Sequence, residues 1–197
     1  MNQTFVESAR ARSQIYEWLA AALHLPQEDM RRTEFVGSLR DACRSLGLTD
    51  LDEDIEAVGK ALAESETLQP LTIEYCRLFY GPNHLEAPPY ESVYRDGPRL
   101  MGDSTMDVIR TYRAEGLELD DTFRNLPDHV SAEMEFMSYL SVREAEAWEA
   151  ADRERALVYL SKQQSFLREH LCRWIPQFSA RTITVSRTDF YRRIAGI

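Results

Sequence analysis

The sequence predicts an all-α chain, a single-domain helical bundle with one long ordered loop. Apolar residues recur at the three-to-four-residue spacing of amphipathic helices through most of the chain. No segment alternates apolar and polar residues convincingly enough to predict a half-buried strand. The 197 residues, 44% of them hydrophobic, suit one domain with a sizeable core. We therefore expect residues 1–197 to form a single all-helical domain.

The first helices are predicted from apolar stripes and from the residues that stop them. The stripes cover, in order, about residues 9–23, 36–46, 51–62 and 71–78, and the stops are Pro26, Gly47 and Gly81-Pro82. Thr49 or Asp50 is placed to cap the third helix, because both side chains can accept a backbone N–H bond.

A long loop, about residues 82–102, follows the fourth helix. It contains four of the chain's eight prolines. It also carries Tyr90, Tyr94 and Leu100, so it is predicted to be ordered and not a linker. Loops of this length inside compact domains are usually functional. The tyrosines either anchor the loop in the core or form a recognition surface, and Pro88-Pro89, which would hold the rings in place, favours recognition.

The second half of the chain is predicted to form three more helices. Asp103 or Ser104 caps the first, which ends near Gly116. Pro127 lies in the first turn of the second, a long helix through Trp148. The stripe of the last spans Leu157–Trp174 and includes Leu157, Leu160 and Gln164, and this helix ends at Pro176. The segment Thr182–Val185 is β-prone but too short to build a sheet. A break near 149–152 is a candidate hinge for domain swapping, so we expect a monomer or a domain-swapped dimer.

Composition limits the classes of partner. Lys+Arg 23 against Asp+Glu 33 gives a net charge of -10, which repels nucleic acid and either favours a cationic peptide or only confers solubility. The cysteines Cys43, Cys76 and Cys172 form no CxxC pair, which excludes zinc-ribbon and thioredoxin-like readings and suits a reducing compartment. No apolar run approaches the roughly 20 residues of a membrane helix, and no secretory leader is recognisable. We therefore expect neither secretion nor a membrane span.

Enzyme chemistry finds little support in the sequence. There is no GxSxG elbow and no phosphate-binding loop, and Ser92 is more simply read as a hydroxyl that ties the loop down. His129 and Glu133 lie four apart on a predicted helix and could bridge a metal. A zinc site needs three or four ligands, however, and no other histidine has a suitable spacing. We expect no enzyme and no metal, and keep a metal-dependent hydrolase using His129 and Glu133 as the least favoured alternative.

The central segment carries a set of short motifs in a specific order. They are Tyr75-x-x-Leu78-Phe79-x-Gly81-Pro82, Pro88-Pro89-Tyr90-Glu91-Ser92-Val93-Tyr94, Leu100-Met101-Gly102, Pro127-Asp128-His129, Glu133-x-Glu135-Phe136-Met137 and Phe166-x-x-x-His170-Leu171-x-x-Trp174-x-Pro176-x-Phe178. In this order and separation they resemble the TorD/DmsD family of redox-enzyme maturation chaperones, over about residues 5–180.

The resemblance implies a cytoplasmic chaperone that binds the twin-arginine leader, the apo-form, or both, of a molybdenum-cofactor oxidoreductase similar to DMSO or TMAO reductases. It also implies that the chaperone assists cofactor insertion before export. No resident cofactor is expected; a guanine-nucleotide-regulated switch is the alternative, although GTP would need a weak or atypical site. Carboxylates can hold arginine bidentately and aromatic or Met-lined grooves can hold an apolar run. The residues expected to bind the leader or client are Tyr90, Glu91, Ser92, Tyr94, Asp128, His129, Glu133, Glu135 and Met137. Because Asp128 and His129 belong to the same set of motifs as the loop of about residues 82–102, we expect them to lie beside it.

Overall fold

The computed structural model describes residues 2–31, 33–81, 85–97, 100–120 and 123–197, and in these ranges all regular structure is helical. The α-helices are α1 (Asn2–Ala22), α2 (Thr33–Ser45), α3 (Asp52–Glu64), α4 (Gln69–Phe79), α5 (Glu91–Arg95), α6 (Asp103–Ala114), α7 (Val130–Glu149), α8 (Arg153–Phe166), α9 (Cys172–Val185) and α10 (Asp189–Ile194). Short 3₁₀ turns cover Glu28–Arg31 and Thr49–Leu51, and a π turn, η3, covers Leu167–Leu171. The all-α prediction is confirmed.

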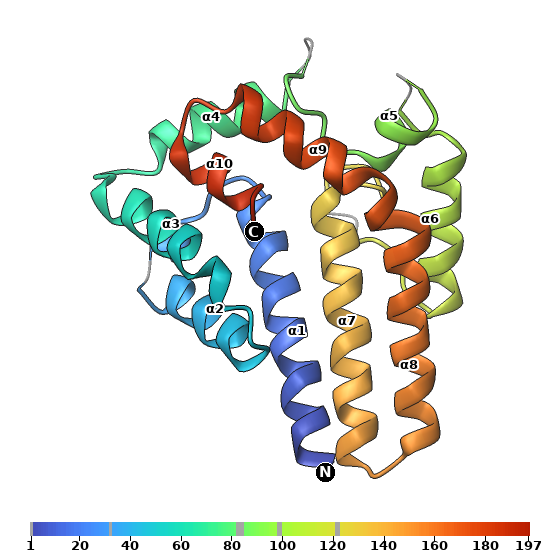
Figure 1. The fold of residues 1–197 in the computed structure, drawn as a ribbon. Coiled ribbons are helices and arrows are strands. Elements are labelled where there is room, and N and C mark those ends of the chain that lie inside the picture. Colours follow the sequence, from blue (N-terminus) through green and yellow to red (C-terminus); the bar gives the residue numbers. More distant parts are fainter. Residues whose placement is uncertain (1, 32, 82–84, 98–99, 121–122) are drawn as a thin grey trace.

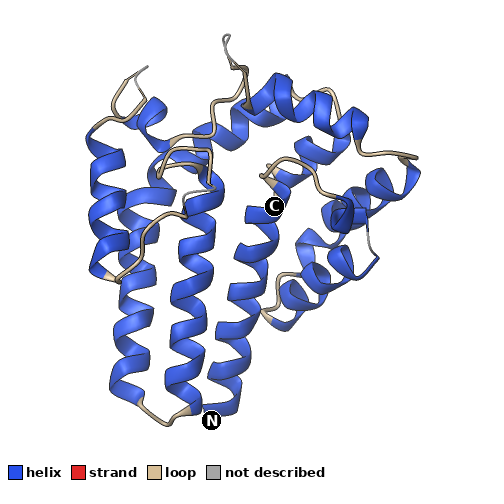
Figure 2. Ribbon diagram, turned by 180° about the vertical axis from the view of Figure 1, so that it is seen from behind, coloured by secondary structure: helices blue, strands red, loops and turns tan. Residues whose placement is uncertain are grey.

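Three long helices, α1, α7 and α8, lie side by side and form the body of the bundle (Figure 1). Helices α2 and α3 flank α1 on one side, α6 lies on the far side of the bundle, and α4, α9 and α10 cross its upper end (Figures 1 and 2). Helix α7 is buried over most of its length, including Val130, Met137 and Leu140. A helix that is buried on most of its sides belongs at the centre of a bundle.

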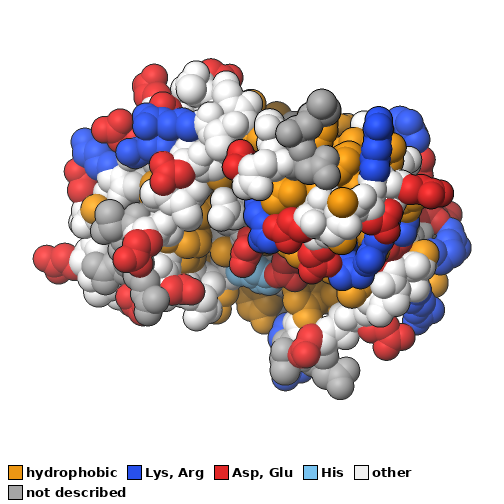
Figure 3. All heavy atoms as spheres, turned by 90° about the horizontal axis from the view of Figure 1, so that it is seen from below, with side chains coloured by type: hydrophobic (Ala, Val, Ile, Leu, Met, Phe, Trp, Pro, Cys, Tyr) orange, Lys and Arg blue, Asp and Glu red, His pale blue; other side chains and the backbone are white. Residues whose placement is uncertain are grey.

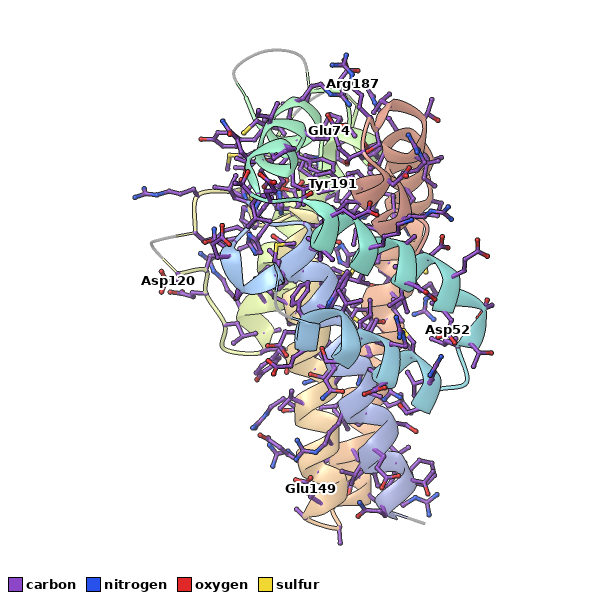
Figure 4. All side chains as sticks on the ribbon, turned by 90° about the vertical axis from the view of Figure 1, so that its left-hand side faces the viewer. Asp52, Glu74, Asp120, Glu149, Arg187 and Tyr191 are labelled. Carbon is purple, nitrogen blue, oxygen red and sulfur yellow. The ribbon has the colours of Figure 1, made fainter. Side chains whose placement is uncertain are left out.

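Polar contacts from α4 hold the crossing helices to one another. Glu74 accepts the backbone N–H of Arg187 at 2.6 Å and the guanidinium of Arg77 at 2.7 Å. Tyr191 of α10 donates to the carbonyl of Leu71 at 3.5 Å, and the side chains of Glu74 and Tyr191 lie close to each other where α4 meets α10 (Figure 4). None of the helices in the described residues has the length and apolar composition that crossing a membrane requires.

The predicted end of the last long helix at Pro176 is wrong. Pro176 lies inside α9, which continues through Thr182 to Val185, so the β-prone segment is helical. The π turn η3 precedes this region, and the N–H of Cys172 bonds to the carbonyl of Leu167. Trp174 and Phe178 are buried on either side of the proline. Their burial and the locally widened turn keep the chain helical despite the donor that proline removes.

The predicted inward face of α8 is also displaced. Leu157 is 46% exposed and Gln164 is exposed, whereas Ala156, Gln163 and Phe166 are buried. A buried polar contact sets this rotation, because the Gln163 amide donates to Glu144 of α7 at 2.7 Å. A buried amide must find partners, so α8 turns Gln163 inward and leaves Leu157 outside.

Several helix starts differ from the prediction, and at α6 a side chain from the preceding loop provides the cap. Thr49 and Asp50 form a 3₁₀ turn before α3 and do not cap it. Gly102 is the N-cap of α6, and Asp96 accepts the backbone N–H of Ser104 at 2.9 Å and its hydroxyl at 2.6 Å. Pro127 lies in a turn before α7, not in its first helical turn.

The long loop is ordered over its described residues, and α5 is a short helix inside it. The parts of this loop at residues 82–84 and 98–99 lie outside the described residues. The α7–α8 connection contains Ala151 at a positive φ of 57°, and the hinge near 149–152 stays a prediction.

Candidate functional site

The predicted site residues converge where the long loop meets the start of α7. The backbone N–H of Glu91 donates to the carbonyl of Asp128 at 3.0 Å, and that of Val130 donates to Pro89 at 2.9 Å. Tyr90 and His129 form an antiparallel bridge between these hydrogen bonds. Asp128 and His129 therefore lie beside the loop, as the sequence predicted.

Asp128 caps the short helix α5 from outside it. Its Oδ2 atom accepts the backbone N–H of Ser92 at 2.9 Å, and both residues have no exposed surface. Ser92 is the second residue of α5, a position whose N–H has no partner inside the helix. The Asp128 carboxylate is therefore a cap that holds α5 in place.

Glu91 ties α5 to the π turn between α8 and α9. Its buried carboxylate pairs with Arg95 one turn later, and its Oε2 atom lies 2.9 Å from Nδ1 of His170. The Arg95 guanidinium also donates to the carbonyl of Glu169 at 3.0 Å. A buried charge needs such partners, and here they connect the loop to the bundle.

Glu133 lies fully buried on the first turn of α7. Its Oε2 atom accepts the indole N–H of Trp174 at 3.1 Å. Burial first, and the negative charge of Glu91 second, raise the pKa of the Glu133 carboxyl well above its usual range. The equilibrium of the Glu133 carboxyl is therefore shifted towards its protonated form, because an apolar interior and a like charge both disfavour a second carboxylate.

His129 is the N-cap of α7. Its Nδ1 atom accepts the backbone N–H of Ser131 at 3.1 Å, and the residue is 1% exposed. Burial, with a smaller contribution from His24, lowers the pKa of His129 to about 3. The ring is neutral, and because Nδ1 accepts, its proton is on Nε2. That Nε2–H has no acceptor among the residues that the structure describes.

The aromatic and Met candidates anchor the loop and the core. The Tyr94 ring stacks on Trp174 with centroids 5.6 Å apart, and burial raises the pKa of its hydroxyl to about 12. Tyr90 is buried against His129, and Met137 is fully buried. Of the alternatives that the sequence left open for the tyrosines, the anchoring role fits this geometry.

Glu135 is the predicted site residue that lies exposed, and it borders a groove. The groove holds about 160 Å³, lies between α7 and the segment after α6, and is lined by Tyr112, Leu117, Glu118, Leu119, Ala132, Glu135, Phe136 and Tyr139. A second hollow of about 250 Å³ shares Tyr112, Leu117, Glu118 and Leu119 with it. We call these two hollows together the acid–aromatic groove.

His24 lies beside Glu135. Its Nε2 atom is 2.9 Å from Oε1 of Glu135. Its ring packs edge-on with the Phe123 ring, with centroids 6.1 Å apart. From below, a histidine side chain is visible in a hollow that is walled by hydrophobic and acidic side chains (Figure 3). Asp120 lies on the same segment as Leu117 and Leu119, at its outer edge (Figure 4). Sequence reasoning missed His24 and this segment; the Leu117-Glu118-Leu119 alternation was the signal available.

A larger hollow of about 650 Å³ lies between α6 and α8 and has a different character. Its walls carry Arg95, Arg110, Lys162 and Arg173, and its floor includes Phe136 and Phe166. Several of these cations are paired with carboxylates, as Lys162 is with Glu115 at 2.6 Å. A cationic peptide is therefore better matched to the acid–aromatic groove than to this hollow. Among the described residues no group of three His, Cys, Asp or Glu side chains has the arrangement of a metal site.

Comparison with known proteins finds a matching family, related sequences and a similar crystal structure. The family described as nitrate reductase delta subunit matches residues 40–180. Relatives named chaperone protein TorD include one from Vibrio parahaemolyticus, 23% identical over 94% of this chain and 88% of its own length. Another, from Photobacterium profundum, is 28% identical over 90% of this chain and 84% of its own. A crystal structure from Archaeoglobus fulgidus, named for redox enzyme maturation, has a TM-score of 0.58 at 19% identity and covers 93% of this chain and 89% of its own.

Proposed function

The chain belongs to the nitrate reductase delta subunit family and, within it, to the TorD/DmsD-like redox-enzyme maturation chaperones, and on that premise we propose that it binds the twin-arginine leader of a molybdoenzyme in the acid–aromatic groove. Its partner is the catalytic subunit that carries this leader. The chaperone holds that subunit in the cytoplasm before export, while the cofactor is inserted. The curated relatives are named as chaperones and not as catalysts.

The observation that carries this proposal is the composition of the groove. Glu118 and Glu135 are exposed carboxylates at its edge, and Leu117, Leu119 and Tyr139 form an accessible apolar wall. Carboxylates bind guanidinium in a planar, bidentate geometry, and an apolar run buries its surface against aromatic rings. The chain's net charge of -10 adds a long-range attraction for an arginine pair.

The buried candidates have a supporting role in this proposal. Asp128, Glu91 and Glu133 are occupied by the contacts that hold α5 and α9 against α7. They fix the position of the first turns of α7, and Glu135 lies on the second of these turns. Their replacement would weaken leader binding indirectly, through the position of α7.

Calorimetric titration with a synthetic leader peptide tests the proposal. Glu135→Gln and Glu118→Gln should each weaken binding about two- to fivefold, the range for an exposed charge pair. Glu154→Gln, at the opposite end of the bundle on α8, is the matched control and should bind as the wild type does. Raising the salt concentration should also weaken binding, mainly through the association rate.

A leader with both arginines replaced by lysine separates shape from charge. It keeps the charge but loses the planar fork, so it should bind more weakly than the arginine leader. Equal binding of the two leaders, no salt effect and no effect of the Glu118 and Glu135 substitutions would together refute the groove as the leader site. Stronger binding of GTP than of the leader would favour the nucleotide-switch alternative.

A further inference from the structure

His24 occupies the space that the proposed function requires for a leader arginine. It follows the end of α1, and its imidazole lies 2.9 Å from the Glu135 carboxylate. The side chain of His24 is 32% exposed and that of Glu135 is 54% exposed. An exposed pair of this kind contributes little stability, so an incoming cation can exchange with the imidazole at low cost.

The surroundings of His24 suit a guanidinium equally well. The Phe123 ring packs edge-on against the His24 ring, with centroids 6.1 Å apart. The His129 ring lies nearly parallel to the His24 ring, with centroids 6.3 Å apart. A guanidinium is planar, as imidazole is, and it stacks on neutral rings. It also offers Glu135 a fork of two N–H groups, where His24 offers one ring nitrogen. The exchange therefore favours arginine over histidine at this position.

His129 supplies a second, independent observation. Its Nε2–H is buried, carries the proton of a neutral ring, and has no acceptor among the described residues. Its ring neighbours are Tyr90, Phe123 and His24, and His24 is the one whose side chain a ligand would move. A buried donor of this kind gains a full hydrogen bond when an acceptor reaches it. A carbonyl of an extended peptide main chain is the acceptor that every leader provides.

We propose that His24 is a displaceable occupant of the leader site: a leader arginine replaces its imidazole on Glu135, and a main-chain carbonyl of the same peptide then accepts the Nε2–H of His129. This inference rests on the proposed function and specifies its contacts. His24 thereby favours peptides whose cation binds Glu135 more tightly than the imidazole does. His129 then forms a hydrogen bond with the peptide backbone next to that cation.

Two substitutions at His24 with opposite expected effects test the exchange. His24→Ala removes the competitor and should tighten binding of the arginine leader about two- to fivefold. His24→Arg places the chain's own guanidinium on Glu135 and should weaken binding by at least as much. Gln164→Ala, an exposed change on α8, is the control and should bind as the wild type does. Thermal unfolding checks that each variant folds.

Imidazole nitrogen NMR tests the His129 contact separately. Saturating leader should shift the Nε2–H resonance of His129 and slow its exchange with water, while Nδ1 stays unprotonated. If folded His24→Ala binds no more tightly than the wild type, or His24→Arg binds no more weakly, the exchange is refuted. An Nε2–H resonance that the leader leaves unchanged refutes the main-chain contact. Failure of the wild-type protein to bind any leader would instead refute the proposed function itself.

Discussion

The raised pKa of Glu133 leads to a prediction about how the stability of the protein depends on pH. Glu133→Gln replaces a buried carboxylic acid by an amide of nearly the same shape. The amide oxygen can accept the Trp174 indole N–H, as the carboxyl does now at 3.1 Å. Its NH₂ group can donate towards the Glu91 carboxylate, as a protonated acid does. The variant should therefore fold as the wild type does and keep α7 against α9.

The magnitude follows from proton linkage. In the unfolded chain the Glu133 carboxyl ionises near its ordinary pKa of 4.5, whereas burial and Glu91 raise its pKa in the folded protein. Between the two pKa values the folded state holds one proton more, so the free energy of unfolding falls as pH rises, by about 1.4 kcal/mol per pH unit. Glutamine does not titrate. Its advantage over glutamate should therefore grow at this rate above pH 4.5, until the folded pKa is passed.

Urea unfolding of both proteins at several pH values between 5 and 8 measures this difference. Glu133→Leu is the matched control, because it also removes the titration but leaves the buried Trp174 N–H without its acceptor. It should show the same pH trend as Glu133→Gln while being less stable by about 1–3 kcal/mol at every pH. Parallel stability curves for the wild type and Glu133→Gln would refute the reasoning, since Glu133 would then carry the same charge in both states.

Other substitutions test further contacts. His129→Asn keeps an N-cap acceptor for Ser131. In the wild type the free energy of unfolding should fall by about 1.4 kcal/mol per pH unit as pH falls from 6.5 towards the folded pKa of about 3, and the variant should lack this loss. Urea unfolding at pH 5 and 7 checks this, and an unchanged loss would contradict it. Gly102→Ala places a Cβ atom against Oδ2 of Asp96, the cap of α6, and should lower stability by about 1–3 kcal/mol; an unchanged melting temperature would contradict that. Ala151→Gly relieves a φ of 57° and should stabilise the protein by about 1 kcal/mol; calorimetry would contradict this by showing a lower melting temperature.

The helices were largely predictable because their causes are local. The stripe through Ala9 and Leu23 and the stop at Gly47 each depend on residues within a few positions, and α1 and α2 follow them. At α5 and α6, however, the residue that fixes the start of the helix lies outside the helix. Asp96 caps α6 from eight residues away, and Asp128 caps α5 from 36 residues away. Such contacts depend on the tertiary fold, and the pattern of residues along the sequence does not reveal them.

The candidate site was predictable in its location but not in its exposure. Pro88–Tyr94 and Asp128–His129 do meet, as the sequence predicted, yet the contacts between them are those of a buried joint. Carboxylates are usually exposed, so the pattern gave no reason to place Glu91 inside. Its burial depends on Arg95 and His170, and His170 lies 79 residues away in sequence. The groove beside Glu135 depends likewise on the return of the segment after α6 to α7.

One distinction at the site was nevertheless contained in the sequence. Glu133 and Glu135 are two positions apart on a helix, so their side chains point about 200° apart. The apolar residues Val130 and Met137 lie three residues before and four residues after Glu133, so the three side chains share one face of α7. Glu133 had to face the core and Glu135 had to face away from it, and they are buried and exposed respectively. A carboxyl group within an apolar stripe is thus better interpreted as a buried structural group, and its neighbour on the other face as the one available to a cationic peptide.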